Sequence, residues 1–136
     1  MSRTDMRSAL RASLAAGTAA AAFAVVLVAP GTAQAASYDD CPPGDVCFYN
    51  GANGSGKMCK WDGDDPDWRN GAVYCRWAAT DNVRSVYNNG KKGVYQDVVY
   101  YSGKDYTNRI GCTKVGKKGN LTGTYRLRSH KWVTSC

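Results

Sequence analysis

The sequence contains no glutamate and only one histidine, His130, so the side chains that most often carry acid–base chemistry are scarce. Enzymatic catalysis needs a nucleophile beside a base, or paired carboxylates in a pocket. The carboxylates of residues 36–136 are all aspartates, concentrated in segments rich in the turn residues Gly, Asn and Pro. These residues therefore predict that the protein is not an enzyme, and that His130 is a structural or solvent-facing residue of a terminal strand.

Long apolar segments are also missing after residue 36. No stretch there approaches the roughly 20 apolar residues of a membrane-spanning helix, and none keeps a 3.6-residue apolar period over ten positions. Short runs of β-branched and aromatic residues occur instead, at 45–49, 72–77, 83–87, 93–101 and 130–133. Turn-forming residues separate these runs, at 50–56, 62–71, 88–93, 102–108 and 114–120. The pattern predicts an all-β, mostly antiparallel fold and no membrane insertion.

The first 35 residues are typical of a secretory signal peptide. Arg3, Arg7 and Arg11 precede an uncharged, alanine-rich run, whose apolar stretch at 19–29 is only 11 residues long. Small residues precede a predicted cleavage after Ala35. A retained signal anchor is the alternative. We therefore expect a secreted, extracellular protein with one domain, residues 36–136.

Six cysteines follow the predicted cleavage site, and an even number in a short exported chain is typical of a disulfide framework. A zinc site is disfavoured because the sequence has no C-x-x-C pair and only one histidine. Many connectivities remain open at this stage. Proximity along the chain favours the pairs Cys41–Cys47 and Cys59–Cys75, which leaves Cys112–Cys136.

The formal net charge is +7, and most of the basic residues lie in the second half of the chain. No alternation of arginine with aromatic residues indicates a nucleic-acid site, so no nucleic-acid partner is expected. Two interpretations of the lysines stay open, namely solubilising surface charge and attraction to anionic cell envelopes.

The chain contains an internal repeat. Tyr49 and Gly56 stand seven positions apart, and Tyr101 and Asn108 repeat this spacing 52 residues later, again around a short polar turn. A serine follows each unit, at Ser85 and Ser129. Asparagine in the place of glycine is intelligible because asparagine tolerates left-handed backbone conformations better than most residues.

This repeat resembles the βγ-crystallin Greek key, in which an aromatic residue and a glycine shape a folded hairpin and a later serine bonds back over it. Together with the leader, the opening segment 41–56 and the closing "SHKWV", it resembles the secreted actinobacterial peptidase inhibitor family that includes the streptomycete metalloproteinase inhibitor. The resemblance implies a disulfide-stabilised β-sandwich of two Greek-key motifs, about 41–90 and 93–136. Four strands per motif would give about eight strands.

The same resemblance implies a monomeric inhibitor of extracellular proteases, chiefly metalloproteases of the thermolysin kind. In the streptomycete inhibitor the inhibitory loop lies between two nearby cysteines in the second half of the chain. Here Cys112 has no cysteine within 20 residues, so that reactive site cannot be carried over. A killer-toxin-like antimicrobial or envelope-binding protein with the crystallin fold is the alternative function.

Calcium-binding crystallins carry two Asp or Asn residues, two free positions, and then Ser or Thr followed by Ser. Asp81, Asn82 and Ser85 match this pattern, but Val86 replaces the last serine. The resemblance therefore implies a degenerate calcium site at most, and no other cofactor or metal is expected. The alternative is that Asp81 and Asn82 only shape a turn.

Inhibitors of this kind present a rigid loop that loses little entropy on docking. The first candidate loop is residues 62–75, which end at a cysteine. Its candidate contact residues are Asp62, Asp64, Asp65, Trp68 and Arg69. Trp68 is either a buried plug of a small core or an exposed interface anchor. The second candidate loop is residues 112–123, which begin at a cysteine.

Overall fold

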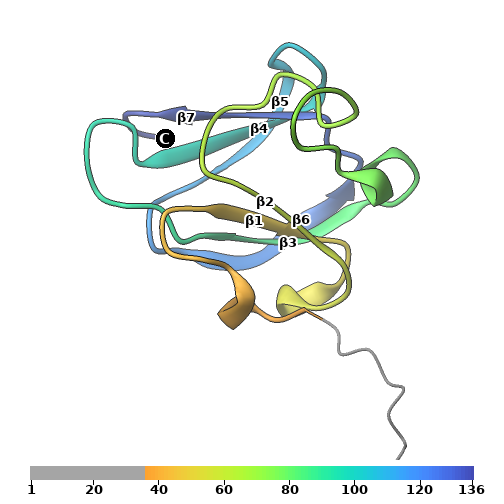
Figure 1. The fold of residues 1–136 in the computed structure, drawn as a ribbon, viewed down its shortest axis with the longest axis horizontal. Helices are drawn as coiled ribbons and strands as arrows, with labels where there is room; N and C mark the ends of the chain where they lie inside the picture. Colours follow the sequence, from red (N-terminus) through yellow and green to blue (C-terminus); the bar gives the residue numbers. More distant parts are fainter. Residues whose placement is uncertain (1–35) are drawn as a thin grey trace, which may run out of the picture. The chain divides into compact units, whose positions relative to one another are not determined.

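Seven strands form two antiparallel sheets in residues 36–136, the part of the chain that the computed structural model describes (Figure 1). The predicted signal peptide, residues 1–35, lies outside the described residues. The strands are β1 (Val46–Tyr49), β2 (Met58–Trp61), β3 (Val83–Asn88), β4 (Asp97–Gly103), β5 (Thr107–Thr113), β6 (Lys118–Tyr125) and β7 (Ser129–Val133). Short 3-10 helices are η2 (Tyr38–Asp40), η3 (Ala52–Gly54) and η4 (Arg76–Ala79). No helix of the described part is long and apolar enough to span a membrane.

The two sheets face each other as the layers of a sandwich, with strand orders β2-β1-β3-β6 and β5-β4-β7 (Figure 1). Each motif contributes to both layers, because β6 of the second motif joins β3, and Asp65 of the first motif pairs with His130 in β7. Asp65 and His130 exchange two backbone hydrogen bonds of 3.1 Å. The all-β prediction is confirmed.

The structure has seven strands, where the resemblance implies about eight. The place of the eighth strand is taken by the single Asp65–His130 bridge beside β7. The ladder ends after this bridge, because the Asp67 amide donates to Asp65 Oδ1 at 2.9 Å and the Arg128 carbonyl accepts from the Trp68 amide at 2.8 Å. The segment after Pro66 is a loop in place of a strand.

Two predicted strand segments are also wrong. Residues 72–77 form a loop and the start of η4, and residues 93–96 precede β4 as part of a connection. Both segments contain β-branched and aromatic side chains, but neither is a strand of either sheet. Conversely, the glycine-containing β6 was partly interpreted as a turn, although its backbone pairs with β3.

The hairpin between β1 and β2 is held by Ser85 of β3. The Ser85 hydroxyl donates to the Gly51 carbonyl at 2.7 Å and accepts from the Gly54 amide at 2.9 Å. Gly56 in this hairpin has a φ of 82°, a left-handed conformation in which glycine is unstrained. Tyr49 is fully buried at the start of the hairpin.

The hairpin between β4 and β5 repeats this arrangement. The Ser129 hydroxyl donates to the Gly103 carbonyl at 2.6 Å and accepts from the Tyr106 amide at 3.1 Å. Asn108 has a φ of 61°, so asparagine takes the left-handed position that glycine takes in the first hairpin. Tyr101 occupies the place corresponding to the first aromatic residue. The two motifs therefore share their local geometry as well as their residue spacing.

Removing either serine hydroxyl is expected to destabilise the fold. Ser85→Ala and Ser129→Ala each leave a hairpin amide and carbonyl without their partner, which costs about 1–3 kcal/mol when the groups stay buried. Urea unfolding measures the loss. Ser135→Ala, at an exposed serine near the C-terminus, is the control and should change stability by less than about 0.5 kcal/mol. Equal effects of all three substitutions would contradict the role assigned to the two motif serines.

The core between the sheets is rich in aromatic side chains. Its buried members include Val46, Phe48, Trp61, Trp68, Val83, Val98, Tyr100 and Leu127. Strand β1 is buried on both faces, because Cys41, Cys47 and Tyr49 form a second cluster on its outer side, with Tyr38 of η2 packed against them. The Tyr38 and Tyr49 rings meet edge to face, 5.5 Å apart. The segment before β1 therefore covers the outer face of the first sheet.

All six cysteines are paired. The disulfides are Cys41–Cys47, Cys59–Cys75 and Cys112–Cys136, the pairs that chain proximity favours, with Cα–Cα distances of 5.8, 5.8 and 5.7 Å. Such distances are ordinary for disulfides. The second disulfide ties β2 to the end of the loop that follows it.

Candidate functional site

The acidic segment after β2 is folded onto the sandwich by its own carboxylates. Asp64 Oδ1 accepts a 2.7 Å hydrogen bond from the Trp132 backbone amide, and Asp65 Oδ2 accepts one of 2.8 Å from Trp61 Nε1. Burial raises the pKa of the Asp65 carboxyl. Asp62 stays exposed. Of these three predicted contact residues, the structure thus uses Asp64 and Asp65 within the fold and leaves Asp62 facing solvent.

Asp67 holds the next part of the acidic segment against Arg128, the residue that precedes β7. Its carboxylate pairs with Arg128, at 3.0 Å from Nε, and accepts from the Arg69 amide at 3.0 Å. The hydrogen bond from Arg128 holds the pKa of Asp67 below its usual value. Arg69, another predicted contact residue, is therefore held in place through its backbone and is only half-exposed.

Trp68 is completely buried, with 0% of its surface exposed. Its indole stacks on Trp61 with ring centroids 4.5 Å apart and also contacts Phe48 at 4.8 Å. Its Nε1 donates a 2.9 Å hydrogen bond to His130 Nδ1. Of the two alternatives for Trp68, the structure shows the core plug, so this side chain is not an exposed interface anchor.

His130 is a buried structural residue. Because an indole N–H can only donate, Nδ1 must accept, and the imidazole proton lies on Nε2, which donates to the Gly63 carbonyl at 2.7 Å. Burial lowers the pKa of His130 to about 4. The imidazole is therefore neutral near pH 7, and it connects β7 to the acidic segment.

Residues 70–74, which we call the tethered loop, project into solvent between two fully buried residues, Trp68 and Cys75. The base of the loop is closed because the Cys75 amide donates a 2.8 Å hydrogen bond to the Trp68 carbonyl. The Cys59–Cys75 disulfide holds the same end on β2. Both ends of the exposed segment are thus fixed by the core.

The tethered loop displays two adjacent apolar side chains, Val73 and Tyr74, which are 38% and 55% exposed. A hollow of about 600 Å³ lies beside it, lined in part by Val73, Trp61 and Asp62. This segment lies within the first predicted loop, but the predicted contact residues were Asp62, Asp64, Asp65, Trp68 and Arg69. The Asn70-Gly71 turn dipeptide is a signal that the residues after it belong to a loop, and Gly71 has a φ of 100°.

The second predicted loop, residues 112–123, is not a tethered loop. Cys112 and Thr113 end β5, and residues 118–123 belong to β6, so only residues 114–117 form a turn. Gly116 supplies a positive φ of 79° in this turn. A four-residue connection between strands of the two sheets leaves no long exposed segment for a protease to bind.

The predicted calcium ligands take part in hydrogen bonds that shape the fold. Asp81 Oδ2 accepts from Asn50 Nδ2 at 3.0 Å, and Asn82 Nδ2 donates to Thr124 Oγ1 at 3.2 Å. The Ser85 hydroxyl is buried and bonded to the first hairpin. Within the described part of the chain, no three His, Cys, Asp or Glu side chains are grouped closely enough to hold a metal ion.

Residues 34–113 match the family model Inhibitor_I36, which describes peptidase inhibitor family I36. The chain belongs to this family. The resemblance to a peptidase inhibitor family is thereby confirmed, and membership of an inhibitor family supports the prediction that the protein is not an enzyme. The matched range includes the tethered loop and ends before β6.

A comparison with curated proteins gives no match. Among solved structures, Geodin, a βγ-crystallin from Geodia cydonium, is similar with 16% sequence identity and a TM-score of 0.46. The similarity covers 65% of this chain and 48% of that one, so this chain spans about half the length of Geodin.

Proposed function

We propose that the inhibitor is secreted, acts as a monomer and blocks an extracellular protease by placing the tethered loop in the substrate cleft. The observation that carries this proposal is the exposure of Val73 and Tyr74 beside two residues that are fully buried. A segment with both ends fixed has little conformational entropy left to lose when it docks. The disulfide at Cys75 limits the movement of the loop further.

The side chains of the tethered loop indicate the kind of cleft that would receive it. Val73 is β-branched and apolar, and Tyr74 offers an aromatic face with a polar tip, a combination that interfaces favour. The complementary protease has an apolar substrate pocket. Metalloproteases of the thermolysin kind are the first candidates because of the resemblance to the streptomycete inhibitor.

Titration of thermolysin with the inhibitor should show stoichiometric loss of activity, and subtilisin serves as a serine protease for comparison. Tyr74→Ala is expected to raise the inhibition constant for protease bound at the tethered loop about 30-fold, since truncating a central interface residue costs about 2 kcal/mol or more. Tyr125→Ala, at an exposed tyrosine of β6, is the matched control and should leave the constant unchanged.

Two negative results have different meanings. A wild-type protein that inhibits neither protease would remove these two targets, and salt-sensitive adsorption to cells would then favour the envelope-binding alternative. Inhibition of unchanged potency and unchanged stoichiometry in both Tyr74→Ala and Val73→Asp would preserve the inhibitor function and reject the tethered loop as its site.

A further inference from the structure

Most of the exposed large apolar side chains of the described residues belong to two Val-Tyr dipeptides. These side chains are Val73, Tyr74, Val94, Tyr95 and Tyr125. Val94 and Tyr95 are the most exposed of them, at 69% and 68%. They lie in residues 89–96, which we call the linker because it connects β3 of the first motif to β4 of the second. Apolar surface left in water is unfavourable, and a group of such residues on a monomer often marks a binding surface.

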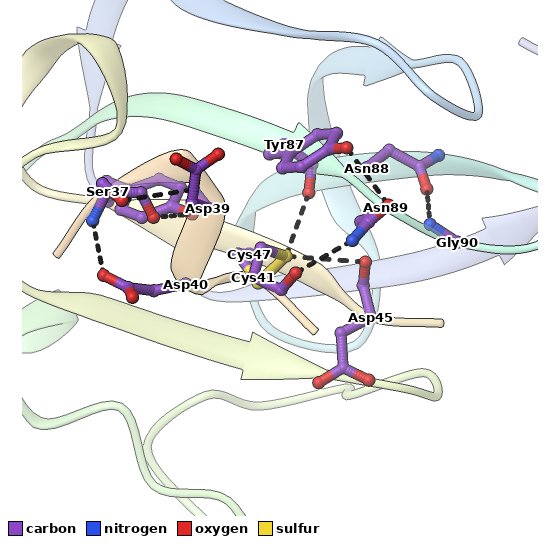
Figure 2. Close-up of a disulfide and its surroundings, with 11 residues drawn as sticks. Ser37, Asp39, Asp40, Cys41, Asp45, Cys47, Tyr87, Asn88, Asn89 and Gly90 are labelled. Carbon is purple, nitrogen blue, oxygen red and sulfur yellow. Dashed lines mark hydrogen bonds between the residues drawn. A yellow bond between two sulfur atoms is a disulfide. The ribbon is translucent and has the colours of Figure 1, made fainter. Parts of the chain in front are cut away.

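The start of the linker is held on the core of the first motif. The Asn89 amide donates to the Asp45 carbonyl at 2.9 Å, and the Asn89 carbonyl accepts from the Gly44 amide at 2.7 Å. Asn89 Nδ2 also donates to the Cys41 carbonyl at 2.8 Å, as Figure 2 shows. The Cys41–Cys47 disulfide fixes the segment that supplies these partners.

The two ends of the linker are joined by one buried side chain. Asn88 is fully buried, its Oδ1 accepts from the Gly90 amide at 2.9 Å (Figure 2), and its Nδ2 donates to the Gln96 carbonyl at 2.9 Å. The Gln96 amide donates to the Val133 carbonyl of β7 at 3.0 Å. Like the tethered loop, the linker is therefore an exposed segment with a fixed base.

We propose that the linker is a second protease-binding loop, which presents Val94-Tyr95 to the same class of apolar substrate pocket that the tethered loop fits with Val73-Tyr74. This inference rests on the proposed function. The shared dipeptide indicates shared specificity, because β-branched and aromatic side chains in the same order need the same adjacent pockets. A fixed base lowers the entropy cost of docking at both places.

The two loops lie at different places on the sandwich. Figure 1 shows the linker (teal) at the left of the sandwich and the loop after β2 (green) at the upper right. A hollow of about 680 Å³ lies beside Tyr95 and Trp132, and it shares Asp62 and Asp64 with the hollow beside the tethered loop. This hollow gives a partner side chain a place to enter next to the exposed tyrosine.

Counting the thermolysin molecules bound by each of four proteins tests the inference. These are the wild type, a tethered-loop variant (Val73→Asp with Tyr74→Asp), a linker variant (Val94→Asp with Tyr95→Asp) and their combination. We expect the wild type to inactivate two thermolysin molecules per inhibitor, each variant one, and the combination none. Light scattering gives the masses of the complexes, and circular dichroism confirms that the variants, changed only at exposed positions, remain folded.

Several results would overturn the second site. The first such result is a wild type that inactivates one thermolysin molecule per inhibitor, a linker variant that does the same, and a tethered-loop variant that inactivates none. It would reject the linker as a site and leave the proposed function intact. Loss of all binding in either variant alone would indicate a single composite site. If the wild type is a dimer in the absence of protease and the linker variant is a monomer, the linker is a self-association surface. A wild type that binds no thermolysin would remove both loops as sites for this protease.

Discussion

Replacing Trp68 with alanine is expected to lower the free energy of unfolding by about 3–5 kcal/mol, the usual cost of truncating a buried tryptophan. The substitution leaves a cavity against Trp61 and Phe48. It also removes the indole N–H that donates a hydrogen bond to His130 Nδ1. Natural domains have only about 5–15 kcal/mol of stability. Urea denaturation followed by circular dichroism measures the loss.

Trp68→Phe serves as the matched variant, because it keeps much of the ring volume and removes only the indole N–H. It should cost less than the alanine substitution. Inhibition by a folded Trp68→Phe protein should stay close to that of the wild type, since the indole does not reach the surface. A Trp68→Ala protein as stable as the wild type would contradict the core position of this residue.

Acidification is expected to destabilise the protein between about pH 6.5 and pH 4. Burial lowers the pKa of His130 to about 4 in the folded state from 6.5, so in this range the unfolded chain binds a proton that the folded protein excludes. The free energy of unfolding therefore falls as the pH falls, at up to about 1.4 kcal/mol per pH unit. The total loss is about 3 kcal/mol below pH 4, and the effect vanishes above pH 6.5.

Three aspartates modify this pH dependence. Burial raises the pKa values of Asp45 and Asp65, which opposes the effect of His130, because the folded protein then binds a proton more readily than the unfolded chain. The lowered pKa of Asp67 adds a loss of stability at more acidic pH, where this carboxylate would be protonated. The contribution of the imidazole is therefore isolated by comparison with a variant that lacks it.

Urea midpoints measured at pH 7.0, 5.5 and 4.5 test this expectation. His130→Gln is the control, because glutamine does not titrate, so its stability should change much less over the interval even if it starts lower. A wild-type protein whose stability is constant from pH 7.0 to pH 4.5 would show that the imidazole is not buried in the neutral form.

Features that depend on neighbouring residues were predictable from the sequence. The short β-branched runs predicted an all-β chain, and the repeated spacing of Tyr49 and Gly56 with Tyr101 and Asn108 identified two similar hairpins. Those hairpins depend on local backbone conformation, in which glycine and asparagine accept a positive φ. That Ser85 and Ser129 each bond across a hairpin was implied by the resemblance of the repeat to the βγ-crystallin Greek key.

The two exposed loops could not be identified in the same way. Residues 72–77 and 93–96 resemble strands because Val73, Tyr74, Val94 and Tyr95 are typical strand residues. A strand, however, exists only where another strand offers hydrogen-bond partners, and no pattern within one segment shows whether that partner is present. The same side chains that would have been buried in a sheet are therefore exposed on loops.

The sequence alone determined the fold class and the duplication, because these follow from residue type and short-range spacing. Only the tertiary structure decided that Trp68 and His130 form a buried pair and that the two Val-Tyr pairs face solvent. Burial is a property of all the segments that pack around a residue, and the partners of Trp68 lie on β1, β2 and β7. No local pattern contains that information.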